Sequence, residues 1–172
     1  MFAKFFYFSR RRVIMGGMDR TIFIFIDGCG VSRDDASNPF FLAASRHLPF
    51  WKNGMTLPDG TPIAAIDATL DHEFILYEYF QTDIYAHRRP LEECVSLIRG
   101  FDALIGDLLS RLDKKNDTLV LASDHGNLED YPVRGHSRNP VPLIAWGQHG
   151  ARLRKKIKSI SDVTPALLEL FP

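Results

Sequence analysis

The stretch TLVLASDHGNLED, residues 118–130, runs from apolar and β-prone residues directly into Ser123, Asp124 and His125. Its first five residues lack the alternation of a half-exposed strand, which predicts a strand buried on both faces of a parallel sheet. In open α/β sheets, functional side chains gather beyond the carboxyl ends of the strands. A buried strand that ends in an aspartate and a histidine therefore indicates both a fold class and the position of a site.

Other apolar segments of strand length lie on either side of this stretch. They cover residues 21–26, 74–80 and 141–146, with a weaker segment at 62–68. Residues 90–113 carry apolar side chains at helical spacing, and shorter helices are expected at 38–47, opened by Asn38 and Pro39, and at 162–171, capped near Asp162. Strands that alternate with helices predict an α/β fold, a three-layer sandwich around a largely parallel, mixed sheet.

The composition limits the classes of partner. The chain has 172 residues, 45% of them hydrophobic, which is enough for one sizeable core. Its formal net charge is zero, so neither nucleic acid nor an anionic membrane is expected as a partner. No segment is long and apolar enough for a membrane span. Cys29 and Cys94 are too few for a disulfide framework; we expect small buried side chains and a cytoplasmic location.

The first seventeen residues differ from the rest of the chain, because an aromatic cluster is followed by three arginines and two glycines. Their order is the reverse of a secretory signal, in which the basic residues come first. We interpret residues 1–17 as a disordered extension, with Met18 as an alternative start and a membrane-surface tag as a less favoured interpretation. Residues 18–172 are then a single domain.

Acidic and histidine side chains follow several of the predicted strands. Taken alone, each has an ordinary structural explanation as a turn, cap or loop residue. Taken together, they would converge at one edge of the sheet, and carboxylate and imidazole are ligands that suit zinc, manganese or iron. Six ligands suit two ions, which would also relieve the repulsion between the carboxylates. The six candidates are Asp27, Asp83, His87, Asp124, His125 and His136. We interpret the remaining histidines, His47, His72 and His149, as structural or solvated.

Four motifs in this order resemble those of the alkaline phosphatase superfamily, in the branch of the cofactor-independent phosphoglycerate mutases and phosphopentomutases. They are FIDGCG, TDIYAH, SDHGNLED and HSRNPVPLIAWG, and SDVTPALLEL resembles the closing helix of that branch. The resemblance implies an alkaline phosphatase-like core that holds two divalent metal ions, Mn²⁺ or Zn²⁺ by preference and Fe²⁺ or Mg²⁺ as alternatives. It implies that Asp83, His87 and His136 hold one ion and that Asp27, Asp124 and His125 hold the other.

The sequence departs from this family between the first strand region and TDIYAH. The family carries there a serine or threonine that accepts the phosphoryl group, whereas here only residues 70–72 separate IAAIDAT from EFILYEYF. We infer an internal shortening at this point, with Thr69 as the weak candidate for a substitute nucleophile and Ser32 as another nearby hydroxyl. Candidates for contacts to the ligands or to a phosphorylated substrate are Asn127, Glu129, Arg134 and Arg138.

Three hypotheses for function follow. The first is phosphoryl transfer or phosphate-ester hydrolysis on a small phosphorylated substrate at a two-metal site, with a mutase as the least favoured reaction. The second is a truncated or degenerate metal-binding domain without turnover. The third is an α/β binding module that takes up no metal. Loss of interior elements would expose apolar faces, so self-association is also expected.

Overall fold

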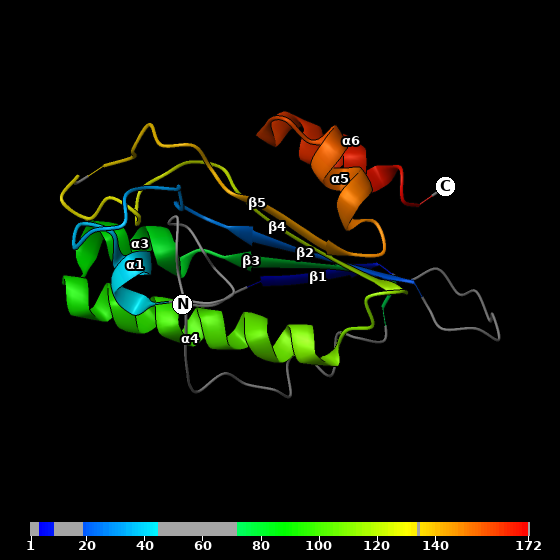
Figure 1. Ribbon diagram of the computed structural model, residues 1–172, viewed down its shortest axis with the longest axis horizontal. Helices are drawn as coiled ribbons and strands as arrows, with labels where there is room; N and C mark the ends of the chain where they lie inside the picture. Colours follow the sequence, from blue (N-terminus) through cyan, green and yellow to red (C-terminus); the bar gives the residue numbers. More distant parts are fainter. Residues whose placement is uncertain (1–3, 9–18, 45–71, 134, 172) are drawn as a thin grey trace.

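The computed structural model describes residues 4–8, 19–44, 72–133 and 135–171. Five strands form one mixed sheet in the order β1-β3-β2-β4-β5, in which the three central strands are parallel and both edge strands are antiparallel to their neighbours (Figure 1). The strands are β1 (Lys4–Phe8), β2 (Arg20–Ile26), β3 (Phe74–Tyr79), β4 (Asp117–Ser123) and β5 (Leu143–Gly147). The helices are α1 (Pro39–Ala43), α3 (Gln81–Arg88), α4 (Leu91–Arg111), α5 (Gly150–Lys156), the 3₁₀ turn η1 (Ile160–Asp162) and α6 (Val163–Leu168).

Helices cover both faces of the sheet, which gives the three layers expected from the sequence. Helices α1, α3 and α4 lie against one face, and α5 and α6 lie against the other (Figure 1). Every residue of β4 is buried. Leu119 and Leu121 pack in the core on the α4 side, whereas Val120 and Ala122 pack in the core on the α5 and α6 side. The absence of polar alternation in β4 thus follows from its burial between two helical layers.

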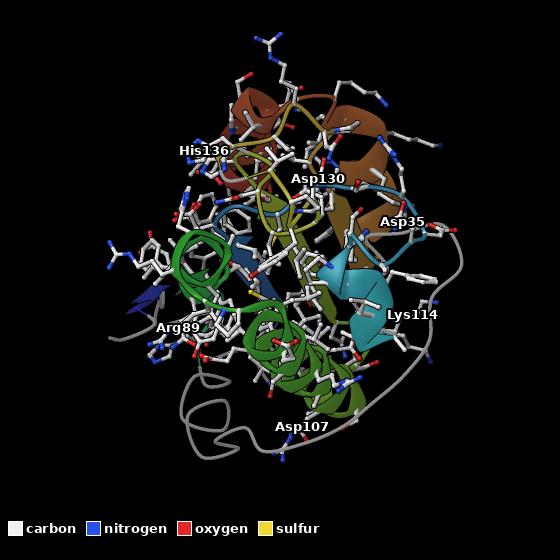
Figure 2. All side chains as sticks on the ribbon, turned by 90° about the vertical axis from the view of Figure 1, so that its left-hand side faces the viewer. Asp35, Arg89, Asp107, Lys114, Asp130 and His136 are labelled. Carbon is white, nitrogen blue, oxygen red and sulfur yellow. The ribbon has the colours of Figure 1, made fainter. Side chains whose placement is uncertain are left out.

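The parallel strands end at the same level. Ile26 at the end of β2 is paired with Tyr79 of β3 and with Ser123 of β4. The residues that follow these three strands therefore emerge side by side at one edge of the sheet. Figure 2 looks onto this edge from the left of Figure 1 and shows His136 and Asp130 on loops that lie across it.

A partly buried ion pair links β2 and β4 at the opposite end of these strands. Arg20, the first residue of β2, donates from Nε and Nη2 to the two carboxylate oxygens of Asp117, at 2.7 Å each. Asp117 is the first residue of β4, its side chain is fully buried, and it also accepts from the backbone N of Asp113. This two-point contact is a strong form of charge-assisted hydrogen bonding.

The structure differs from the sequence-based expectations in four segments. Residues 4–8 form a strand, although residues 1–17 were expected to be disordered; the apolar KFFYF run supplies hydrogen-bonding partners for the otherwise open edge of β3. Helices α3 and α5 were not predicted, because their sequences are short and polar. The C-terminal helix begins with η1, where Asp162 accepts from the backbone N of Ser159 in a capping box. The expected strand at 62–68 lies outside the described residues, as do Thr69 and His47.

The described helices include none that could cross a membrane, since none is both long and apolar enough. Both cysteines are buried and free, as expected from their number and spacing.

Candidate metal centre

The first group of ligand candidates lies beyond β2 and β4. Asp27 directly follows β2, and Asp124 and His125 directly follow β4. His125 Nε2 lies 3.4 Å from Asp27 Oδ1 and 3.6 Å from Asp124 Oδ2. One ligand atom from each of these three side chains falls within 4.8 Å of the others. The shared register of the two strands is what brings the three side chains together.

The second group lies at α3 and the loop before β5. Asp83 is in the first turn of α3, and His87 lies one turn further along the same helix. His87 Nε2 is 3.4 Å from Asp83 Oδ1, and His136 Nε2 is 3.8 Å from the same oxygen. These atoms also fall within 4.8 Å of one another. The helical spacing of four residues places Asp83 and His87 on one face, because side chains at i and i+4 are neighbours.

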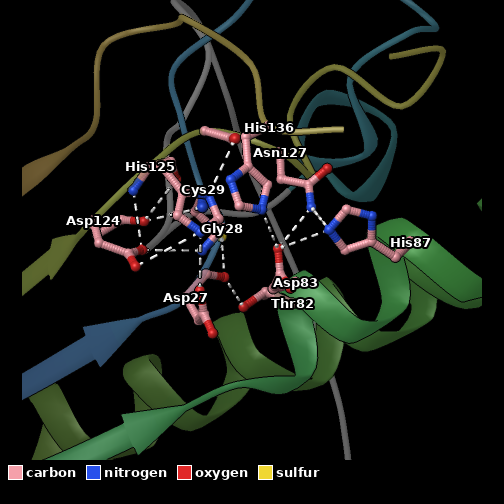
Figure 3. Close-up of polar contacts among 12 residues, drawn as sticks. Asp27, Gly28, Cys29, Thr82, Asp83, His87, Asp124, His125, Asn127 and His136 are labelled. Atoms are coloured by element: carbon pink, nitrogen blue, oxygen red, sulfur yellow. Dashed lines mark hydrogen bonds and ion pairs between the residues drawn. The ribbon is translucent and has the colours of Figure 1, made fainter. Parts of the chain in front are cut away.

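Two histidines join the groups. The rings of His125 and His136 are stacked, with centroids 3.7 Å apart and an angle of 15° between their planes (Figure 3). His136 also lies 5.6 Å from His87, measured between ring centroids. The loop that carries His136 is held by an isolated β-bridge between Gly126 and Ser137. The two groups are therefore parts of one centre.

Hydrogen bonding directs the ring of His125. Its Nδ1 lies 3.3 Å from the backbone carbonyl of Gly126, and its Nε2 faces Asp27 and Asp124. With the proton on Nδ1 and donated to that carbonyl, Nε2 presents a lone pair toward the two carboxylates. This is the orientation that a metal-binding imidazole requires.

Gly28 lies between a carboxylate of the first group and a carboxylate of the second. Its φ is +69°, in the left-handed region that glycine adopts without strain. A Cβ at this position would lie 2.8 Å from Asp83 Oδ1, and the backbone N of Gly28 lies 3.4 Å from Asp124 Oδ1. Only glycine permits this close approach between the end of β2 and the first turn of α3.

Hydroxyl groups beside the centre are already engaged in structural bonds. Thr82 Oγ1 donates to the carbonyl of Asp27 at 2.5 Å, and Ser123 Oγ donates to the carbonyl of His125 at 3.1 Å. Both residues are fully buried. Ser137 Oγ donates to Glu129 Oε1. These three hydroxyls link the loops that carry the ligand candidates to backbone and side-chain acceptors.

A fully buried carboxylate connects the loops. Glu129 Oε2 accepts from the backbone N of Gly30 at 2.7 Å and from that of Asn127 at 2.8 Å. Its Oε1 accepts from Ser137 Oγ and, at 3.0 Å, from Asn139 Nδ2. Four donors satisfy the buried charge without a cation. Glu129 therefore ties together the loops after β2 and β4 and the loop before β5.

The crowding of carboxylates changes the electrostatics of the site. Burial raises the pKa of Asp27 above its ordinary value, and the charges of Asp124 and Asp83 raise that pKa further. The nearby histidines act in the opposite direction. Burial, followed by the charge of Glu129, also raises the pKa of the Cys29 thiol. Cys29 is therefore a neutral core residue, whereas Asp27 is a carboxylate that a neighbouring cation would stabilise.

The donor set fits a divalent cation at each group. Each group offers carboxylate oxygen and imidazole nitrogen, the ligands that Zn²⁺ and Mn²⁺ accept. The raised pKa of Asp27 adds a reason for positive charge to be favourable there. Asp27, Asp124 and His125 would hold one ion, and Asp83, His87 and His136 would hold the other.

The other sequence-based candidates are placed differently. Asn127 contacts Asp83 and His87 directly, as Figure 3 shows. Glu129 lies behind the ligands as described above, and Arg138 is exposed to solvent. Arg134 and Thr69 lie outside the described residues. The sequence did not identify Gly28 or Ser137 as part of the centre, although a glycine directly after Asp27 was a possible signal.

The fold and the paired Asp/His groups define an alkaline phosphatase-like α/β protein. The chain belongs to the metalloenzyme superfamily, whose model matches residues 52–172, more than half of the sequence. Five of the six ligand candidates lie within that match, and Asp27 lies before it.

Curated relatives are named as 2,3-bisphosphoglycerate-independent phosphoglycerate mutases. The protein from Pyropia yezoensis is 30% identical over 63% of this chain and 23% of its own length, and that from Paracoccus denitrificans is 32% identical over 63% and 22%. The protein from Desulforudis audaxviator is 25% identical over 83% of this chain and 29% of its own. The chain thus spans less than a third of these relatives.

Among solved structures, the PH0037 protein from Pyrococcus horikoshii shares 28% sequence identity with this chain. The superposition has a TM-score of 0.40 and covers 49% of this chain and 25% of the other.

Proposed function

We propose that this chain binds two divalent metal ions and acts on a small phosphorylated substrate, by hydrolysis of a phosphate ester or by phosphoryl transfer. The observation that carries the proposal is the pair of Asp/His groups joined by the stacked rings of His125 and His136. The metalloenzyme family and the relatives named as phosphoglycerate mutases support the same chemistry. Mn²⁺ and Zn²⁺ are the preferred ions.

Divalent ions at the two groups would supply Lewis acidity for the reaction of a phosphate ester. The residues of the chain provide the positions of these charges. Asp27, Asp124 and His125 would fix one charge, and the second group would fix the other. The strands and α3 hold both groups at one edge, so that a phosphate group can lie against both at once.

Hydrolysis is favoured over a mutase reaction. In a mutase, the phosphoryl group must be kept on the protein between two positions of the substrate, which requires a nucleophilic side chain. The three described hydroxyls beside the centre, on Thr82, Ser123 and Ser137, each donate to a protein acceptor, which argues against that role for them. Water as the attacking group requires no such side chain.

A chromogenic phosphate ester tests the proposal. The metal-loaded full chain is expected to hydrolyse p-nitrophenyl phosphate with Mn²⁺ or Zn²⁺, and His125→Ala is expected to lose that activity. His149→Ala is the matched control, because His149 lies at the start of α5 and outside both groups. Equal rates for His125→Ala and the unmodified chain would contradict the proposal.

The engaged hydroxyls also favour a second function, metal binding without turnover. In that case elemental analysis finds up to two ions per chain while hydrolysis stays at the level of His125→Ala. A metal-free binding module gives a third result. A ligand that binds only the folded state raises the melting temperature, so a chain that neither contains metal nor is stabilised by Mn²⁺, Zn²⁺ or Fe²⁺ would exclude both metal-dependent functions.

A further inference from the structure

Asn127 is buried beside Asp83 and His87 of the second group. The residue is 1% exposed, and its backbone N is held by Glu129 Oε2 at 2.8 Å. Its side-chain Nδ2 donates to Asp83 Oδ1 at 2.7 Å and lies 3.1 Å from His87 Nε2 (Figure 3). The other amide atom, Oδ1, is buried and has no hydrogen-bond partner among the described residues.

The amide and a metal ion compete for the same lone pair. A neutral imidazole nitrogen that accepts a hydrogen bond has one lone pair in the ring plane, and His87 Nε2 directs it toward the amide of Asn127. A cation bound by His87 requires that lone pair. The N–H of Asn127 must therefore leave His87 when the second group takes up its ion.

The surroundings limit how the amide can leave. The side chain is enclosed and its backbone is fixed by Glu129, so a large swing is prevented. A half-turn about the Cβ–Cγ bond of Asn127 exchanges the positions of Nδ2 and Oδ1 without changing the volume of the side chain. Either orientation leaves one amide atom without a partner, so the contact with Asp83 and His87 decides between them. N–H is favoured against two acceptors, and C=O is favoured against a cation.

We propose that Asn127 is an additional ligand of the ion held by Asp83, His87 and His136, and that its carbonyl Oδ1 turns toward the ion on loading. The position now filled by Nδ2 is 2.7 Å and 3.1 Å from two ligand atoms of that group. Neighbouring ligand atoms bound to one cation at about 2.0–2.2 Å are about 3 Å apart, so an oxygen placed there has the spacing of a ligand. Amide carbonyls are hard oxygen donors of the kind that suit Mn²⁺.

This inference rests on the proposed metal centre, and metal titration separates the two. The metal-stripped full chain is titrated with Mn²⁺ by calorimetry and with Co²⁺ by its visible absorption. The unmodified chain is expected to bind two ions. Asn127→Leu, which keeps the volume and excludes water, is expected to weaken one of the two sites about tenfold or more and to change the Co²⁺ spectrum of that site. Asn127→Asp, which retains an oxygen, is expected to bind at least as tightly as asparagine.

The matched control is Asn38→Leu. Asn38 is a fully buried asparagine that caps α1 and contributes to neither group, so its replacement lowers stability but leaves both affinities unchanged. Equal or tighter binding by Asn127→Leu overturns the inference, because the amide is then only a competitor; weaker binding by Asn127→Asp also overturns it. If Asn127→Leu does not fold, the metal affinity of Asn127→Asp alone tests the inference. No binding by the unmodified chain overturns the proposed centre as well.

Discussion

Replacing Glu129 by leucine tests whether one carboxylate holds the ligand loops together. Leucine has a similar volume and would exclude water, so the buried backbone N–H groups of Gly30 and Asn127 would lose their acceptor. Each buried donor left unpaired costs about 1–3 kcal/mol, which gives about 2–6 kcal/mol for the two. A domain is stable by about 5–15 kcal/mol, so this is a large fraction of the total.

Glu129→Gln is the matched control, because its amide oxygen can still face both backbone donors. Its NH₂ group would face Ser137 and Asn139, whose side chains can turn to accept, so the loss should be smaller than for leucine. Urea denaturation in the presence of EDTA measures the free energy of unfolding without any contribution from metal. Equal unfolding midpoints for the leucine and glutamine variants would refute the role assigned to Glu129.

Three further substitutions test other parts of the structure. Gly28→Ala should destabilise the fold by about 1–2 kcal/mol, because alanine is strained at the positive φ of this position. It should also weaken metal binding, because the new Cβ would lie 2.8 Å from Asp83 Oδ1. An unchanged metal affinity in calorimetry would contradict this expectation. Arg20→Met should lower the free energy of unfolding by about 2–4 kcal/mol. This is less than the loss for a fully enclosed pair, because the Arg20 side chain is 22% exposed. A denaturation midpoint equal to that of the unmodified chain would show that Asp117 does not need its partner. Asp27→Asn should raise the melting temperature of the metal-free chain at neutral pH and reduce the rise caused by Mn²⁺. The pKa of Asp27 is raised in the fold, so its contribution to stability falls as the pH rises from its ordinary pKa toward the raised one. Asparagine does not ionise and avoids that loss. A lower melting temperature for metal-free Asp27→Asn than for the metal-free unmodified chain would contradict the expected stabilisation.

The central part of the fold was predictable from local sequence. The uninterrupted apolar run in 118–122 indicated burial on both faces, and β4 is buried throughout. Parallel strands that end at one level then bring Asp27, Asp124 and His125 together, and the same rule places α3 beside them. His136 joins them because β5 is antiparallel to β4, so that the loop before β5 lies at the same edge, which the sequence did not indicate. The role of the six side chains as metal ligands stays a prediction.

The remaining features depend on contacts between distant segments. In the sequence, Glu129 is an ordinary polar loop residue. Its role depends on hydrogen bonds from the loops after β2 and before β5, which only the folded chain brings to it. Strand β1 forms because the edge of β3 offers unpaired backbone groups, a property of the assembled sheet and of no local pattern. The sequence of α3 is short and polar, so no helix was predicted there. Its Asp83 and His87 were interpreted as ligands that follow a strand.

The stacked rings of His125 and His136 couple the orientations of two side chains from different groups. Each ring limits the orientation of the other, because their centroids lie 3.7 Å apart. On the proposed assignment, a shift of either ring would therefore change the ligand geometry of the other group as well. Loss of one ring is then expected to alter metal binding at both groups and not at one alone.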